Sequence, residues 1–331
     1  MSGRYQMTSW KKQWLIKKLT MLVLLLLGTS FLTLLLIDLS PIDPVDSYIR
    51  GKMLVVSHEQ AALISERFNA NQHFIMKYLL WLKMILSGDL GTSILYQIPV
   101  SQLIFERFQA SFLLLFGSWF LSGVVGYIVG FLAGITEKSL FDKFFSVLSY
   151  ITLSTPSFWI GMILIMIFSV SLGWFPTSLA SPAQSIDGSV SLGDRLHHVA
   201  LPLLTLTIVS SSNIMLFTRQ KVIAEKKKDY YQFSTVNTKE TLSNKIKQLL
   251  PNTILPAIVL QFASFGEVFG GSMLVEQVFS YPGLGKLTVD AGVGGDIPLV
   301  LGIVLFMTVT IFVGNQLADY IRLKLDPRTV K

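Results

Sequence analysis

The chain has 331 residues, of which 51% are hydrophobic and only 14% are charged, whereas an average soluble protein carries about 25% charged residues. The apolar residues form long runs separated by short polar stretches, a pattern typical of several membrane spans and not of a soluble enzyme. The net charge of +7 does not indicate nucleic-acid binding, because the Lys and Arg residues gather beside the apolar runs and not on one solvated face.

Six apolar runs are long enough to cross a hydrocarbon core of about 30 Å. Lipid offers no hydrogen-bond partners, so each run must satisfy its own backbone as a helix, which predicts an all-α polytopic membrane protein. The first run follows the basic segment 1–18 and is predicted to be a retained helix, since no small-residue cleavage site comes after it. The predicted spans are 19–37, 110–135, 144–172, 201–217, 254–275 and 299–317.

The distribution of Lys and Arg predicts the orientation. These residues gather before the first span and after the second, fourth and sixth, so we expect cytoplasmic termini, including the tail 321–331, and an external loop over 38–109. Apolar residues recur at helical spacing over 61–82 and 100–112, which predicts two amphipathic helices along the outer membrane surface. Two interpretations fit them equally: packing against the spans, or docking a partner.

The five-helix core, 110–320, has a stripe of small residues in its second span. Gly126, Gly130 and Gly134 are four residues apart, so they share one helix face and allow another helix backbone to approach closely. Internal packing is favoured over a partner-specific role, because this spacing is common in membrane helices.

Proline and hydroxyl residues interrupt the third span at Ser154, Thr155 and Pro156. Proline removes a backbone donor, so the helix is predicted to kink there, with hydroxyls free to bond the released carbonyls. Such a kink suits a polar translocation path, and a purely structural kink fits equally well. The same two interpretations apply to Ser212 and Asn213 in the fourth span.

Glu267 is an acid well inside the fifth apolar run. Ionisable groups at depth are costly and normally face a bundle interior or a water-filled cavity. We therefore expect Glu267 to face the translocation path or a subunit interface; the alternative is a structural role in which the side chain is internally hydrogen-bonded or protonated.

The large internal loop, 219–252, is basic and has apolar residues at helical spacing over 236–250. This predicts a short helix parallel to the membrane that a cytoplasmic partner could hold; its lysines follow the positive-inside rule and do not predict nucleic-acid binding. The chain contains no phosphate-binding loop, no two histidines four residues apart, no cysteine and no catalytic motif. We therefore expect no enzymatic activity, and no metal or other cofactor bound by this chain.

Several motifs, in this order, resemble the permease subunits of bacterial dipeptide, oligopeptide and nickel ABC importers, of the OppB or DppB kind. Together they cover nearly the whole chain, so the set is far more specific than any one motif. The motifs are Leu-Ser-Pro-Ile-Asp-Pro (39–44), Gly-Asp-Leu-Gly-Thr-Ser (88–93), Ser-Thr-Pro-Ser-Phe-Trp (154–159), Leu-Gly-Trp-Phe-Pro (172–176), Tyr-Pro-Gly-Leu-Gly (281–285) and Leu-Asp-Pro-Arg (325–328).

The resemblance implies a type I importer permease fold in the bacterial plasma membrane. Such a subunit forms half of a translocation pathway for oligopeptides or dipeptides by alternating access, with nickel or a metal chelate as the alternative cargo. It implies a second homologous permease, two cytoplasmic ATPases that use ATP and Mg, and an external substrate-binding protein. The residues themselves leave a rival of another class, an ion-gradient-driven transporter or channel, which normally shows inverted repeats and paired intramembrane charges.

The resemblance also implies site residues. Thr238 stands where the family's coupling loop has a glycine, and Glu267 stands where the family has a small residue, which suggests an unusual substrate. The implied ATPase-coupling residues are Glu225, Asp229, Tyr230, Ser234, Thr238, Leu242 and Asn252, and those of an external loop or gate are Glu276, Pro282, Gly283 and Gly285.

Overall fold

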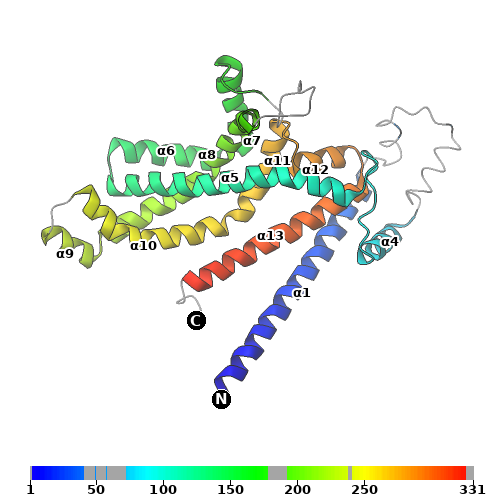
Figure 1. Cartoon of the computed structure of the whole chain (residues 1–331), viewed down its shortest axis with the longest axis horizontal. Helices are drawn as coiled ribbons and strands as arrows, with labels where there is room; N and C mark the ends of the chain where they lie inside the picture. The colour runs from blue at the N-terminus through cyan, green and yellow to red at the C-terminus, as the bar shows by residue number, and fades with distance from the viewer. Residues whose placement is uncertain are drawn as a thin grey trace. The chain divides into compact units, whose positions relative to one another are not determined.

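A computed structural model of the chain describes residues 2–40, 49, 57, 72–177, 192–237 and 241–325. The chain divides into two compact units, Met1–Phe108 with Leu287–Val313, and Gln109–Lys286 with Gly314–Lys331. The helices are α1 (Ser2–Asp38), α4 (Phe74–Leu86), α5 (Val100–Ile135), α6 (Leu140–Ser154), α7 (Ser157–Leu164), the π-helix η1 (Ile165–Ser171), α8 (Leu192–Lys226), α9 (Asp229–Asn237), α10 (Leu242–Ala263), α11 (Phe265–Val278), α12 (Leu284–Val293) and α13 (Ile297–Leu325) (Figure 1).

Four of the described helices, α1, α5, α8 and α13, contain stretches long and apolar enough to cross a membrane. Two bent pairs, α6 with α7 and η1, and α10 with α11, raise the number to six if each pair is one span. The prediction of an all-α membrane protein is confirmed, and the predicted six spans are reached when the bent pairs are counted in this way.

The predicted kink in the third span is confirmed in position, and the structure shows it as a complete break in the helix. The chain bends by 114° between α6 and the α7–η1 stretch. Pro156 disfavours a helical conformation in the residue before it, and Thr155 is accordingly extended, with φ −111° and ψ 132°. The Thr155 hydroxyl donates to the Ile151 carbonyl at 2.7 Å and so satisfies one carbonyl that the break releases.

α5 corrects one prediction. The segment 100–112 is not a separate surface helix, because α5 runs without a break from Val100 to Ile135. No Pro interrupts the run, so the helical pattern of 100–112 continues directly into the second span. Of the other predicted amphipathic helix, 61–82, residues 61–71 lie outside the described residues. Its remaining part falls largely within α4, which begins at Phe74.

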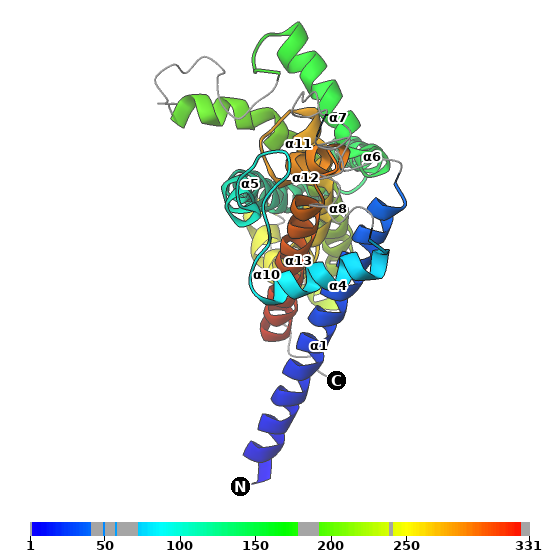
Figure 2. The same ribbon diagram turned by 90° about the vertical axis from the view of Figure 1, so that its right-hand side faces the viewer.

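In the first unit, α4 lies across α1 (Figure 2), where the hydroxyls of Ser30 and Tyr78 are 3.1 Å apart. A turn in the same unit is fastened to Asp296, which is fully buried. Asp296 accepts hydrogen bonds from the Ser93 hydroxyl at 2.5 Å and from the Leu95 amide at 3.0 Å, and it caps α13 through the Leu299 amide at 3.2 Å. The motif at 88–93 is therefore held to the start of α13.

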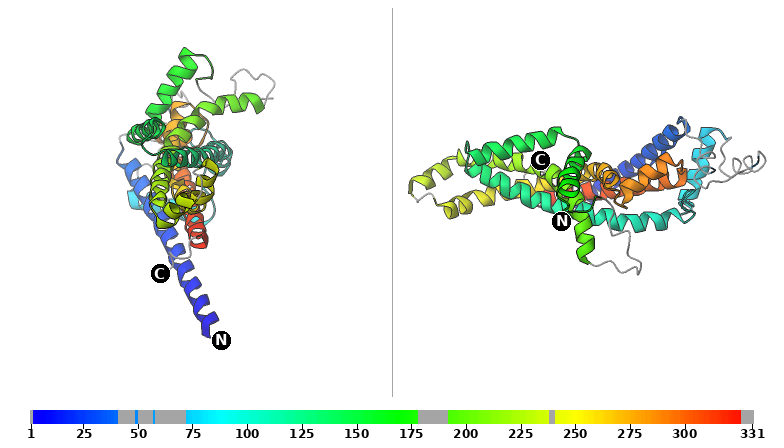
Figure 3. Two further views of the ribbon diagram at one scale, coloured as in Figure 1. Left: turned by 90° about the vertical axis from the view of Figure 1, so that its left-hand side faces the viewer. Right: turned by 90° about the horizontal axis from the view of Figure 1, so that it is seen from above.

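In the second unit, α5, α6 and α8 run side by side (Figures 1 and 3). A Cβ atom added to Gly126 would lie 2.6 Å from the Ser211 carbonyl oxygen, one on Gly130 would overlap the backbone of Met215, and one on Gly134 would lie 2.6 Å from Val222 Cβ. The glycines thus allow α5 to contact α8 directly, which confirms the prediction of internal packing.

Candidate functional site

Tyr230 joins three helices at the start of the internal loop. Its hydroxyl donates to Glu225 of α8 at 2.6 Å and accepts a hydrogen bond from the Asn252 amide of α10 at 3.0 Å. Glu225 is 4% exposed and also binds the Lys228 ammonium at 2.6 Å. Burial, followed by the hydrogen bond to Glu225, raises the pKa of Tyr230, so its hydroxyl stays a donor at neutral pH.

α9 has one face directed inward and one outward. Tyr231 is buried in a cluster with Phe131, Val222 and Leu249, whereas Tyr230 is 44% exposed and Phe233 is 74% exposed. α9 is therefore seated on its neighbours by one side and presents aromatic side chains on the other.

The remaining predicted coupling residues are placed separately. Ser234 accepts a hydrogen bond from the Gln248 amide, and Asp229 and Leu242 are exposed. Thr238 lies outside the described residues. The prediction of a short helix over 236–250 was wrong in its bounds, because α9 ends at Asn237 and a second helix, α10, begins at Leu242. Thr241 caps the start of α10, and α10 continues into the fifth span.

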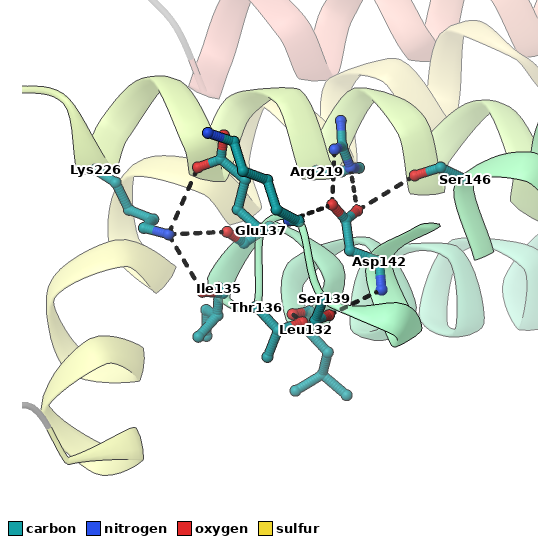
Figure 4. Close-up of polar contacts among 11 residues, drawn as sticks. Leu132, Ile135, Thr136, Glu137, Ser139, Asp142, Ser146, Arg219 and Lys226 are labelled. Carbon is teal, nitrogen blue, oxygen red and sulfur yellow. Dashed lines mark hydrogen bonds and ion pairs between the residues drawn. The ribbon is translucent and has the colours of Figure 1, made fainter. Parts of the chain in front are cut away.

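A buried ion pair ties α6 to α8 near the same loop (Figure 4). Asp142 is 1% exposed and accepts hydrogen bonds from Arg219 Nε and, at 2.8 Å, from Arg219 Nη2. The Lys138 amide donates to the same carboxylate at 2.9 Å, and the Ser146 hydroxyl does so at 3.3 Å. Sequence reasoning missed this pair; the signal available was Ser139 three residues before Asp142, which is the pattern of a helix cap.

Lys226 makes a second contact between α8 and the turn after α5. Its ammonium lies 3.8 Å from Glu137 and donates to the carbonyls of Gly134 at 3.4 Å and Ile135 at 3.2 Å (Figure 4). A cation is favourable at this position because the last carbonyls of a helix carry partial negative charge.

Glu276 organises the predicted external loop. It is fully buried and accepts hydrogen bonds from the Ser111 hydroxyl at 2.7 Å, the Gly285 amide at 2.6 Å and the Lys286 amide at 3.3 Å. A Cβ atom on Gly283 would overlap both Glu276 and Ser111. The structure therefore brings Glu276, Gly283 and Gly285 together around one carboxylate, with Pro282 in the same turn.

The predicted path residues do not form one cluster on this chain. Ser212 is buried and hydrogen-bonded to Thr152, whereas Ser154 and Pro156 are exposed and Thr155 and Asn213 are half-buried. Glu267 is exposed in the first turn of α11, where the helix dipole favours an acid. Their predicted role in transport stays a prediction.

An apolar cavity of about 280 Å³ lies between α5, α8 and α10, with Trp119, Tyr127 and Gln261 in its wall. None of the predicted path residues lines it. Among the described residues, no group of three or more His, Asp or Glu side chains is placed to hold a metal ion.

Comparisons with known proteins relate the chain to transport permeases. Residues 126–331 match the family described as binding-protein-dependent transport system inner membrane component. The oligopeptide transport system permease protein AppB of Bacillus subtilis is 32% identical over 95% of this chain and 98% of its own length. A putative peptide permease of Brucella suis is 30% identical over 92% and 94%, and the nickel import system permease protein NikB of Staphylococcus aureus is 29% identical over 95% and 90%.

Proposed function

Because this chain belongs to the family of binding-protein-dependent transport system inner membrane components, it is a permease subunit of an ABC importer, and we propose that it forms half of a pathway for oligopeptides or dipeptides. The same assignment confirms the expected type I permease fold and decides against an ion-gradient-driven transporter or channel. The peptide cargo is supported by the similar permeases of B. subtilis and B. suis, which are named for peptides. Nickel is the second candidate, supported by the similarity to NikB.

The proposed assembly contains four further kinds of component. A second, homologous permease completes the pathway, two ATPases bind the cytoplasmic side and use ATP and Mg, an external binding protein delivers substrate, and lipid surrounds the spans. In this arrangement both termini and the loop 219–252 are cytoplasmic, and this chain itself binds no cofactor and hydrolyses no ATP.

The observation that carries the proposal is the seating of α9. Tyr230 is fixed at the base of the helix by Glu225 and Asn252, and Phe233 is 74% exposed beside it. Exposed aromatic side chains on a fixed helix are suited to anchor a partner. We therefore assign α9 and its flanks, with Asp229, Ser234, Thr238 and Leu242, to contact with the ATPases.

Alternating access follows from this contact. ATP binding closes the two ATPases, α9 moves with them and the pathway opens outward; hydrolysis returns it inward. A ligand shifts such an equilibrium only by its differential affinity for the two states, so selectivity falls mainly to the external binding protein. The turn around Glu276, Pro282, Gly283 and Gly285 is proposed as the external gate, and Ser154, Thr155, Pro156, Ser212, Asn213 and Glu267 are proposed to contribute to the path.

The coupling role is tested by purifying the chain with its partner subunits. Replacing residues 229–237 with a Gly-Ser linker of equal length is expected to abolish co-purification of the ATPases, and Phe233→Ala to weaken it. Gln97→Ala, on a turn in the first unit, is the control. Co-purification at the wild-type level after linker replacement would refute the coupling role.

Cargo is tested separately in liposomes that contain the complete importer and its binding protein. Uptake of a labelled tetrapeptide that requires ATP supports the peptide proposal. Uptake of a nickel chelate in place of the tetrapeptide would overturn it and favour the second candidate.

A further inference from the structure

We propose that the Asp142–Arg219 ion pair is a positioning device that transmits movement of α9 to the turn between α5 and α6. The proposal rests on the coupling role assigned to α9 above. Its parts are three neighbouring contacts near the C-terminal end of α8, through Arg219, Glu225 and Lys226.

The geometry of the pair favours transmission. Arg219 donates through two nitrogens to the two oxygens of Asp142, and such a planar double contact fixes orientation as well as distance. The carboxylate itself is held by the Lys138 amide at 2.9 Å, and the Asp142 amide is held by Ser139 Oγ at 3.1 Å. Arg219 therefore binds a group that is already fixed to the start of α6.

The Lys226 contact prevents the turn from pivoting about this pair. Arg219 and Lys226 are seven residues apart on α8, which corresponds to about 10 Å along the helix axis. Lys226 binds Glu137 and the last carbonyls of α5. Two separated attachments leave no free rotation between α8 and the turn.

The same segment of α8 receives the movement of α9. Glu225, which binds Tyr230 at 2.6 Å, directly precedes Lys226. A displacement of α9 thus acts on α8 between its two attachments to the turn. Gly126, Gly130 and Gly134 add direct contact between α5 and α8 without an intervening layer of side chains, so these helices have little room to slide.

Stability alone is a weak explanation for such a pair. Removing two charges from water costs about as much as their attraction returns, and apolar replacements of buried ion pairs are often neutral or stabilising. What an apolar contact cannot supply is a fixed orientation between α6 and α8.

The test measures one distance in the assembled importer in two nucleotide states. Spin labels are introduced through Leu140→Cys, at an 85% exposed position at the start of α6, and Gln232→Cys, on the exposed side of α9; the chain has no native cysteine. A second sample pairs the Gln232→Cys label with a label on the partner ATPase. The complex is measured in lipid nanodiscs without nucleotide and with ATP and vanadate, so no knowledge of the cargo is needed.

In the wild type, and in the control Ser146→Ala, which keeps both Arg219 contacts, we expect the distance between positions 140 and 232 to be the same in both states. In Asp142→Asn and Arg219→Lys we expect this distance to shift between the states. Arg219→Lys keeps the charge but not the double contact. This variant therefore still tests the proposal if the Asp142→Asn importer does not assemble.

Two results would overturn the proposal: a distance that already shifts in the wild type, or one that stays constant in both variants. Failure of the underlying coupling role has a different signature. In that case the ATPase would move without α9, so the distance from position 232 to the ATPase label would change between the two nucleotide states in the wild type.

Discussion

Glu276 offers a quantitative test of the turn proposed as the external gate. In Glu276→Ala, the Gly285 and Lys286 amides and the Ser111 hydroxyl lose their acceptor. The hydroxyl can rotate to another acceptor, but the amides cannot, and each buried donor left without a partner costs about 1–3 kcal/mol. Together with the space left by the side chain, this predicts a loss of about 2–5 kcal/mol in the free energy of unfolding.

Glu276→Gln separates hydrogen bonding from charge. Its amide oxygen can still accept from Gly285, so the expected loss is about 1 kcal/mol or less. Unfolding of the purified complex is measured by denaturant titration in mixed micelles. Glu267→Ala, at an exposed acid in the same helix, is the matched control and should lose only about 0.3–1 kcal/mol, the usual contribution of an acid at a helix N-terminus. The reasoning is refuted if Glu276→Ala is as stable as this control, or if the Gln and Ala variants are equally unstable.

Four further predictions concern other contacts. Gly130→Ala should lower the melting temperature of the complex, because its Cβ would overlap the Met215 backbone, whereas Gly270→Ala, with no atom within 4 Å, should not; equal melting would contradict the packing. Asp296→Ala should cost about 2–4 kcal/mol in denaturant titration, since the Ser93 and Leu95 donors lose their acceptor and α13 its cap. Tyr230→Phe should reduce ATP-driven uptake about 2- to 30-fold, and unchanged uptake would remove Tyr230 from coupling. The Tyr230 pKa is raised, so its contribution to stability is present below pH about 10 and is lost as the pH rises through the raised value, which unfolding measurements with and without Tyr230→Phe would show.

Much of the fold could be predicted because lipid leaves an apolar run few alternatives to a helix. The glycine stripe was also readable, since spacing fixes which residues share a helix face. The exact extent of helices was less accessible: α5 absorbed residues 100–112, and the third span broke at Thr155 by far more than a kink. Helical periodicity predicts where one helix lies along the chain, but it does not predict the angle between two halves of a span.

At the candidate site, too, sequence patterns identified individual residues but not the contacts between residues far apart in the chain. Glu225, Tyr230 and Asn252 were singled out by resemblance, and the structure brings them within hydrogen-bond distance. The pairing of Asp142 with Arg219 joins residues 77 positions apart, and each charge alone is explained by its place at the end of a span. Such a pairing depends on how α6 packs on α8, which local spacing does not specify.

The breaks in the two bent spans determine where this subunit can flex. Inside α5 and α8, bending must disrupt successive hydrogen bonds of a continuous helix, and the glycine contacts hold the two helices together. At Thr155 and Pro156 the helical ladder is already interrupted, and Ser264 separates α10 from α11 at an angle of 51°. Bending there costs fewer hydrogen bonds, so these two positions are the least costly places for the second unit to bend.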